Sequence, residues 1–399
     1  MKRKTIPLAI LLAVILSSCS QKLHFKNEVT QAEMQTTLML QEIPKAENKQ
    51  GELVSPRTLE SGELKLVASK DWTSGFFPGQ LWYLYELTKN DKWKQQAIKF
   101  TAPIEQEKFN GKTHDMGFKV YCSFGNGYRL TNNQEYKDII IKAAQTLSTR
   151  FNPKVGALRS WDHNSDKWDF PVIIDNMLNL ELLFEATKLS GDSSFHEIAV
   201  SHANTTLKNH FRDDFSTWHV IGYNPETGAV EKRNTHQGYS DDSAWARGQA
   251  WALYGYTMCY RETKDPKYLL QAQNVAKFLF NNKNMPADLV PYWDFDAPNI
   301  PNEPRDASAA AVISSALFEM STYTKEKNDY LQKAQTILDN LSAKYASPVG
   351  ENKGFILIHS TGSKPHNSEI DVPLSYADYY YLEALVRANR LKNNQPVIQ

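Results

Sequence analysis

Two kinds of helical segment alternate along this chain. Five segments open with an Asn, Asp or Gln that suits a helix start, then an aromatic residue, then apolar residues at i, i+3, i+4 and i+7. Their other positions are polar, which predicts outer helices with one buried and one exposed face. The five segments begin near residues 90, 133, 192, 265 and 327, and a helix near 27–42 is expected to be a sixth.

The segments between them are apolar or small on most faces, as in "DASAAAVISSALFEM". Helices of this kind are enclosed by other helices. They are expected at 75–88, 116–131, 172–189, 243–262, 306–323 and 374–391. Six inner and six outer helices in alternation predict an all-α fold, an (α/α)6 barrel closed by the N-terminal helix. The alternative is an open solenoid of helical repeats, which the uneven repeat lengths disfavour.

The other segments divide the chain and supply its long loops. We expect a signal peptide at 1–19, a segment with the closing helix at 20–65, the barrel at 66–391 and a tail at 392–399. Strand-like residues are confined to loops such as 216–230 and 354–360. The longest connection, about 212–242, is too long for a mere link, and loops of that length are usually functional or disordered.

The N-terminus has the pattern of an export signal. Three basic residues at 2–4 precede an apolar run at 6–16 that is too short to span a membrane. The run ends in "LSSC", which resembles a bacterial lipobox. Lipidation of Cys19 would give an exported lipoprotein in the periplasm or outer membrane of a Gram-negative bacterium. The alternative is an ordinary cleaved signal peptide.

Charge and composition exclude some partners. Lys+Arg and Asp+Glu are equal at 45 each, so there is no electrostatic case for binding nucleic acid or an anionic membrane surface. A membrane contact is therefore expected only through the lipid anchor, and a monomer is expected. Aromatic residues make up 12% of the chain, which suits sugar-binding pockets as well as large helical cores.

Several kinds of catalytic centre are missing from the sequence. There is no HExxH, GxSxG, GxxxxGK[ST] or GxGxxG motif. The ten histidines have no metal-ligand spacing, so we expect no metal and no cofactor. Cys122 and Cys259 lie in apolar helical contexts and are expected to be buried free thiols, although export leaves a disulfide between them open.

Polar residues gather instead at the starts of the inner helices. Trp72 precedes the first inner helix, Asp115 the second, and Asp175 lies in the first turn of the third. The segment "HQGYSDDSAWARGQAW" (236–251) leads into the fourth. Alternation makes the inner helices parallel, so their N-termini meet at one rim, where the partial positive charge favours an anionic ligand. Asp115 alone has a simpler reading as a helix N-cap.

Two of these residues are hard to explain by packing. Asp175 lies between apolar neighbours, so its pKa should be raised, which suits a general acid near neutral pH. Arg247 lies inside an inner helix and needs a partner. Either a structural acid such as Asp241 or Asp242, or the carboxylate of a ligand, meets this need.

Five segments carry a family resemblance. They are "WTSGFFPGQLW" (72–82), "HDMGF" (114–118), "IIDNMLNL" (173–180), "TWHVIGY" (217–223) and "HQGYSDDSAWARGQAW" (236–251). In this order they resemble the unsaturated glucuronyl hydrolases, glycoside hydrolase family 88. The resemblance implies an (α/α)6 barrel that removes a 4,5-unsaturated uronate from the non-reducing end of oligosaccharides made by polysaccharide lyases, with glycosaminoglycan-type disaccharides as expected substrates. It also implies that hydration of the C4=C5 double bond is the first step.

The resemblance assigns roles to residues of this chain. Asp175 is implied as the acid/base carboxylate, and Asp115 as the residue that orients the sugar and tunes that carboxylate. His219 and Gln237 fall at substrate-binding positions, Arg247 and Trp251 lie beside them, and Trp72 is implied to stack on the unsaturated ring.

One loop is expected to contact the second sugar. The segment "HSTGSKPHNSE" (359–369) precedes the last inner helix, so its end should reach the same rim. Ser360, Ser363, Lys364 and His366 offer hydroxyl groups and a positive charge that suit a sulfate or carboxylate. The alternative is a surface loop with Gly362 and Pro365 as turn residues.

Two other functions fit the sequence. One is the related unsaturated rhamnogalacturonyl hydrolase activity on pectin fragments, with the same barrel. The other is a non-catalytic, lipid-anchored glycan-binding protein, which would need the aromatic residues and the arginine but not Asp175 in an apolar helix start.

Overall fold

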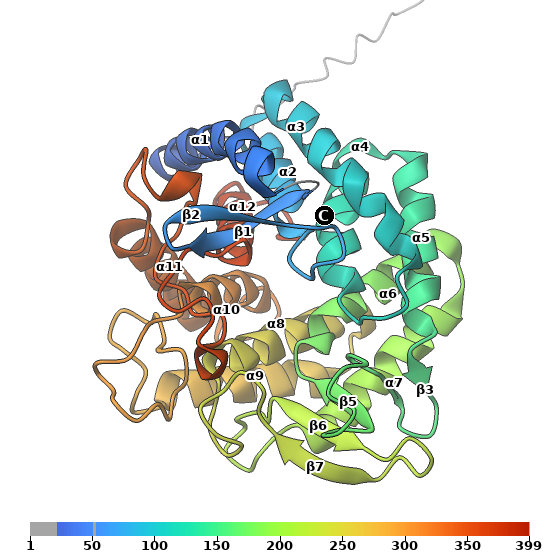
Figure 1. The fold of residues 1–399 in the computed structure, drawn as a ribbon. Coiled ribbons are helices and arrows are strands. Elements are labelled where there is room, and N and C mark those ends of the chain that lie inside the picture. Colours follow the sequence, from blue (N-terminus) through green and yellow to red (C-terminus); the bar gives the residue numbers. More distant parts are fainter. Residues whose placement is uncertain (1–21, 51–52, 399) are drawn as a thin grey trace, which may run out of the picture.

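The computed structural model describes residues 22–50 and 53–398, so the expected signal peptide with Cys19 lies outside the described residues. Within them, inner and outer helices alternate as predicted (Figure 1). The inner ring consists of α2 (Phe76–Thr88), the π-helix η2 (Gly117–Gly125) continued by α4 (Asn126–Thr131), α6 (Asn176–Ser190), α8 (Ala246–Thr263), α10 (Ala307–Met320) and α12 (Ser375–Lys392). The outer layer consists of α1 (Lys26–Gln50), α3 (Asp91–Thr101), α5 (Gln134–Ser148), α7 (Ser193–Asn209), α9 (Pro266–Asn281) and α11 (Lys327–Lys344).

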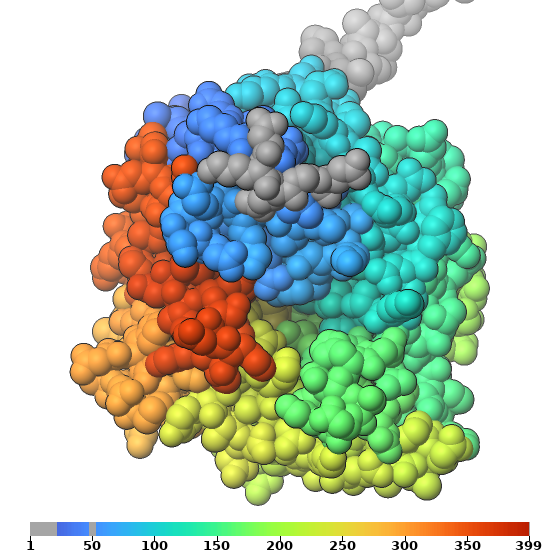
Figure 2. All heavy atoms as spheres, in the orientation of Figure 1, coloured from blue at the N-terminus to red at the C-terminus, as the bar shows by residue number. Residues whose placement is uncertain are grey.

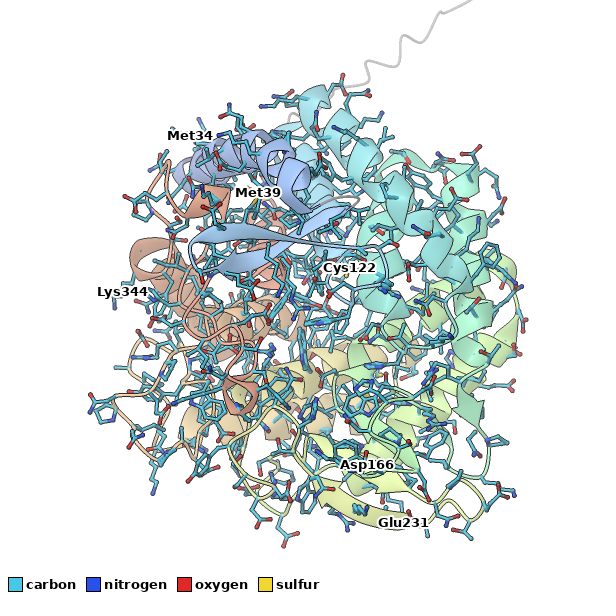
Figure 3. All side chains as sticks on the ribbon, viewed as in Figure 1. Met34, Met39, Cys122, Asp166, Glu231 and Lys344 are labelled. Carbon is cyan, nitrogen blue, oxygen red and sulfur yellow. The ribbon has the colours of Figure 1, made fainter. Side chains whose placement is uncertain are left out.

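The inner helices form a closed ring. Each contacts the next one, and α12 contacts α2, while α1 packs beside α2. Every residue of α10 is buried, as its small and apolar sequence requires, and side chains fill the centre of the ring (Figure 3). The fold is an (α/α)6 barrel, and the solenoid alternative is wrong because the ring closes.

One end of the barrel is made of tight turns. Four inner helices, α2, α4, α6 and α8, end at residues with positive φ, among them Lys89 (56°), Asn132 (54°) and Lys264 (56°), which terminate a helix in the left-handed conformation. The next outer helix in each case (α3, α5, α7 and α9) begins directly afterwards with a side-chain N-cap, such as Asn90, whose oxygen accepts the N–H of Lys92. These turns explain the repeated Asn and Asp of the outer segments. The long loops therefore lie at the opposite end, with the inner-helix N-termini.

A small sheet stands at the long-loop end. It is antiparallel and three-stranded, with β6 (Val220–Tyr223) between β5 (Phe170–Ile173) and β7 (Val230–Asn234). The prediction that a helix begins at 172 was wrong, because Val172 and Ile173 pair with β6 and α6 begins only at Asn176. The long connection 212–242 thus contains a hairpin. The segment 354–360 forms only isolated bridges, such as that of Ser360 with Val372.

Further short strands lie outside this sheet. The hairpin of β1 (Ser55–Glu60) and β2 (Glu63–Val67) follows α1, spans the boundary drawn at 65–66 from the sequence, and contacts α1, α2 and α12. A second short pair is β3 (Phe151–Asn152) with β4 (Ala157–Leu158). None of the helices in the described residues combines the length and apolarity needed to cross a bilayer. Cys122 and Cys259 are buried free thiols, as expected.

Candidate active site

A close helix contact brings the two predicted carboxylates to one place. Gly117 starts η2 against α6, where a Cβ at Gly117 would lie 2.7 Å from the Cα of Asn179. The Oδ1 of Asn179 accepts the N–H of Phe118 at 3.0 Å, which joins the first turns of the two helices. Asp115 and Asp175, each just before one of these turns, therefore line the same cavity.

This cavity lies at the rim where the inner helices begin and has a volume of about 290 Å³. In Figure 2 this face is hollowed between the red segment that precedes α12 and the green segment that precedes β5. Five of the residues singled out in the sequence line the cavity: Trp72, Asp115, Asp175, Gln237 and Ser363. His236, from the segment leading to α8, and His366, from the loop 359–369, line the cavity as well.

Other lining residues were missed from the sequence. Trp161 and His163 come from the long connection before β5, and their rings stack at 5.1 Å with an angle of 20°. That connection has no helical periodicity, so only its aromatic and histidine content, in "SWDHNSDKW" (160–168), pointed to the site. The remaining ones are His114, Phe118, Ile173 and Ser368.

The carboxyl group of Asp175 is the most strongly perturbed group in the cavity. Its residue is only 8% exposed. Burial raises the pKa of Asp175 to about 7, and the nearby charge of Asp115 adds to this, while the cation of Arg247 opposes it. Asp175 occupies the N-cap position of α6 without capping it through its side chain. The group is therefore free to hold and release a proton near neutral pH.

The imidazole of His219 is oriented toward that carboxyl group. Its Nδ1 accepts the backbone N–H groups of His236 (3.1 Å) and Gln237 (3.2 Å). Burial lowers the pKa of His219 well below its ordinary value, so the ring is neutral and its single proton is on Nε2. Nε2 lies 3.7 Å from Oδ2 of Asp175. His219 thus presents an N–H group to a carboxylate that forms when Asp175 loses its proton.

Asp115 is held by side chains rather than acting as a helix cap. The first turn of η2 has no side-chain cap. The Asp115 carboxylate accepts the hydroxyl of Thr113 at 2.8 Å and lies 3.1 Å from Nε2 of His114. The Nδ1 of His114 donates to the carbonyl of Ser160, so the contact with Asp115 is attractive only with a second proton between the two groups. The hydroxyl of Thr113 therefore holds the Asp115 carboxylate in the cavity wall.

Arg247 is found behind the cavity, and its acidic partner differs from both candidates. Its guanidinium donates to Asp306 at 2.7 Å and to the carbonyls of Thr361 and Gly362 at 2.6 Å each. Asp241 instead accepts from its own loop, through the N–H of Thr235. Arg247 therefore braces the loop 359–369 and is not among the lining residues. Trp251 is likewise fully buried, with its ring against Phe118 at 5.4 Å.

The loop 359–369 reaches the rim as expected, but its cation is already paired. Ser363 lines the cavity and its hydroxyl lies 2.7 Å from Nδ1 of His366. The ammonium of Lys364 forms an ion pair with the buried Glu303, and Lys364 is not among the residues that line the cavity. Ser360 is buried under the loop, where its backbone pairs with Val372. If Lys364 bound a sulfate group, its ammonium would have to contact that sulfate while paired with Glu303.

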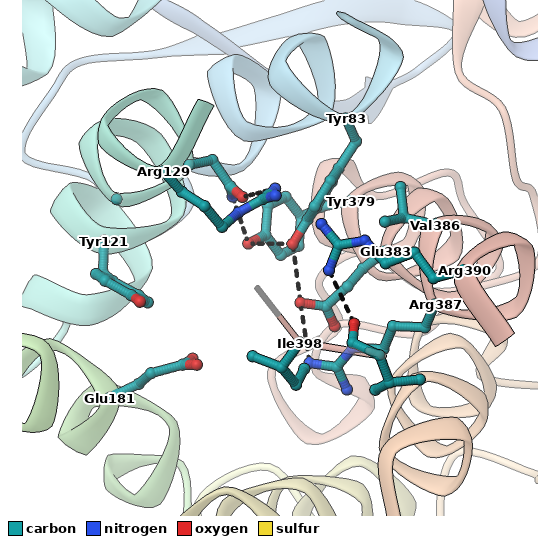
Figure 4. A pocket seen from close by; sticks show the side chains of 13 residues that line it. Tyr83, Tyr121, Arg129, Glu181, Tyr379, Glu383, Val386, Arg387, Arg390 and Ile398 are labelled. Atoms are coloured by element: carbon teal, nitrogen blue, oxygen red, sulfur yellow. Dashed lines mark hydrogen bonds and ion pairs between the residues drawn. The ribbon is translucent and has the colours of Figure 1, made fainter. Parts of the chain in front are cut away.

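A second, smaller cavity of about 70 Å³ lies toward the tight-turn end of the barrel, beside the C-terminal residues Val397 and Ile398 (Figure 4). Its polar side chains pair mainly with one another. The hydroxyl of Tyr83 donates to Glu383 at 2.9 Å, and Arg387 lies 3.4 Å from the same carboxylate. The side chains that line this cavity therefore form a network of hydrogen bonds and ion pairs that we interpret as structural. Within residues 22–50 and 53–398, no three His, Cys, Asp or Glu side chains are grouped as a metal site.

Comparison with known proteins shows the family of this chain. The family described as Glycosyl Hydrolase Family 88 matches residues 45–390. The chain is 57% identical over 327 residues to the unsaturated glucuronyl hydrolase of Formosa agariphila, covering 82% of each protein. It is 34% identical over 331 residues to the unsaturated chondroitin disaccharide hydrolase of Streptococcus agalactiae, covering 81% of this chain and 82% of that protein.

A solved structure gives the same assignment. The crystal structure of an unsaturated glucuronyl hydrolase specific for heparin superposes with a TM-score of 0.86 and 46% identity, over 93% of this chain and 99% of the other. The family match extends from the end of α1 to the last turn of α12, and the structural match covers 93% of this chain. The chain belongs to glycosyl hydrolase family 88.

Proposed function

We propose that this protein hydrolyses lyase-generated oligosaccharides by removing the 4,5-unsaturated uronate at their non-reducing end. Family membership and the glucuronyl hydrolase relatives support this activity. The single observation that carries the chemistry is the buried carboxyl group of Asp175, whose pKa is raised to about 7, in a cavity lined with Trp and His side chains. The comparisons do not favour the rhamnogalacturonyl hydrolase or the non-catalytic binding protein.

The reaction follows from one proton donor. Protonated Asp175 gives its proton to C4 of the double bond, and positive charge develops at C5 and the ring oxygen. Water adds at C5 and returns its proton to the Asp175 carboxylate, which the N–H of His219 stabilises meanwhile. The resulting hemiketal opens and the bond to the next sugar breaks. One water molecule is consumed and no other reactant is needed.

Glycosaminoglycan disaccharides are the proposed substrates. Relatives of this chain are named for heparin and for chondroitin disaccharides, and the identity is greater for the heparin-specific protein. We therefore expect heparin-type unsaturated disaccharides to be the best substrates within a panel of lyase products.

The test follows the ultraviolet absorbance of the C4=C5 double bond. Solutions of the unsaturated disaccharides in the panel should lose this absorbance as the uronate is released. The corresponding saturated disaccharides should not be hydrolysed. A conventional glycosidase with two carboxylates would cleave the saturated glucuronide. Efficient release of the saturated sugar would therefore overturn the proposal.

We also propose that the mature protein is anchored through a lipid on Cys19. The basic residues at 2–4, the apolar run at 6–16 and the "LSSC" sequence support this. Labelled fatty acid should enter the wild-type protein and place it in the membrane fraction, and Cys19→Ala should abolish both. Unlabelled, soluble wild-type protein would instead indicate an ordinary signal peptide.

A further inference from the structure

We infer that a groove beside the active-site cavity binds the reducing-side sugars of longer unsaturated oligosaccharides. This inference rests on the proposed function, because it extends the same substrate. The groove has a volume of about 620 Å³ and is formed by the segment 166–168, the segment 232–241 and the tip of the loop 359–369. Asp166, labelled in Figure 3, marks the first of these segments.

The groove is continuous with the cavity. His236 and His366 line both, and their ring centroids lie 4.6 Å apart. The unsaturated sugar must reach Asp175, which is buried, so the rest of the substrate leaves the cavity at the rim. The cavity of about 290 Å³ is at the lower end of the range of about 300–1,000 Å³ for small-molecule sites. The groove that begins at these two histidines offers further sugars a place outside the cavity.

The groove presents an aromatic face on a rigid turn. Tyr239 is 49% exposed. Its backbone N–H donates to the buried Asp294 at 2.9 Å, and the preceding N–H of Gly238 donates to the hydroxyl of Thr235 at 2.7 Å. Because the backbone of this turn is fixed, only the side-chain torsions of Tyr239 have to be ordered when its ring stacks on a sugar.

The groove also presents a cation that suits a uronate or sulfate group. Lys167 is exposed, its ammonium lies 5.9 Å from the centre of the Trp168 ring, and no ion pair to it is found in the described part of the chain. Asp241, an acid of the same groove, is committed to Asn234 (3.0 Å) and Thr235 (2.8 Å). Lys167 is therefore available to the acidic groups that glycosaminoglycan sugars carry.

The test compares two substrates from one polymer, the unsaturated disaccharide and the unsaturated tetrasaccharide. Tyr239→Ala should raise KM for the tetrasaccharide by about tenfold, an effect expected for one aromatic contact, and leave the disaccharide kinetics unchanged. Lys167→Ala should also raise KM for the tetrasaccharide alone, and added salt should reduce the effect. Asp166→Asn is the matched control. It removes a charge from the same loop, but it should not raise KM for the tetrasaccharide.

The outcomes separate the two proposals. Turnover of the disaccharide by the wild-type protein tests the proposed function by itself. The groove is tested only by the change in KM for the tetrasaccharide relative to the change in KM for the disaccharide. If both variants affect the two substrates equally, or affect neither, the groove does not bind the reducing side.

Discussion

The proton of Asp175 links catalysis to stability. Burial raises the pKa of this carboxyl group from 3.8 to about 7, so the folded protein retains a proton that the unfolded chain has lost at neutral pH. The contribution of this group to stability is therefore complete below pH 4 and declines as the pH rises through about 7. The same residue costs stability at the pH where it is needed as an acid.

Substituting Asp175 by Asn should separate these effects. We expect kcat to fall by about two to four orders of magnitude because the proton donor is lost. The melting temperature should rise relative to the wild type, and by more at pH 8 than at pH 4, because the ionisable group is gone. Activity assays and melting curves at both pH values check this. Near-normal turnover would remove Asp175 from the mechanism.

Arg247 should set the pH dependence of the reaction. Its cation lowers the pKa of Asp175, so Arg247→Gln should raise that pKa and move the loss of activity at high pH toward more alkaline values. Arg247→Lys keeps the charge while losing part of the contact with Thr361 and Gly362, so it should reduce activity without moving the profile. Profiles of kcat/KM against pH measure this. Equal shifts in both variants would show that loop position, not charge, is responsible.

At the level of elements, the site depends on how closely η2 approaches α6. The run 172–174 is compatible with a helix or a strand by periodicity, and the pairing of Val172 and Ile173 with β6 makes these two residues part of a strand. The strand then delivers Asp175 to the start of α6, and the missing side chain of Gly117 lets η2 come close. The position of the two carboxylates is thus set by how η2, β5 and α6 pack together, and not by either residue alone.

Gly117→Ala tests this junction. The added Cβ would lie 2.7 Å from Cα and 2.8 Å from Oδ1 of Asn179, so the helices must separate. We expect a loss of about 1–3 kcal/mol in the free energy of unfolding, together with a fall in kcat that exceeds the loss of folded protein. Gly111→Ala is the control, since the nearest atom to its added Cβ is 3.7 Å away. Unchanged kcat in folded Gly117→Ala protein would contradict the argument.

On the scale of the whole molecule, the two ends of the barrel differ in the length of their connections and in what those connections build. Long loops and the sheet build the cavity at one end, and tight turns close the other. The chain enters at the tight-turn end, where the carbonyl of Lys22 accepts from Asn393 at 2.9 Å and the N–H of His24 donates to Asn389 at 2.9 Å. Cys19 precedes Lys22 by three residues, a reach of about 11 Å at most.

The proposed lipid anchor therefore predicts an orientation on the membrane. The tight-turn end should face the bilayer and the cavity should open away from it. A fluorophore on Asp91→Cys, at the start of α3, should be quenched by a headgroup-bound quencher more strongly than one on Thr227→Cys, in the turn between β6 and β7. The reverse order would contradict this orientation.

Sequence alone determined the alternation of helices, the closed barrel expected from it, and the candidate acids before the second and third inner helices. These features depend on the periodicity of apolar residues and on the residue types at helix starts. Both are local signals, so they can be read directly from the sequence. Only the tertiary structure decided that Asp306 neutralises Arg247, that Glu303 holds Lys364, and that Trp161 and His163 enter the cavity. Such contacts join distant segments, as Arg247 and Thr361 are 114 residues apart, and no local pattern encodes which partner each charge will meet.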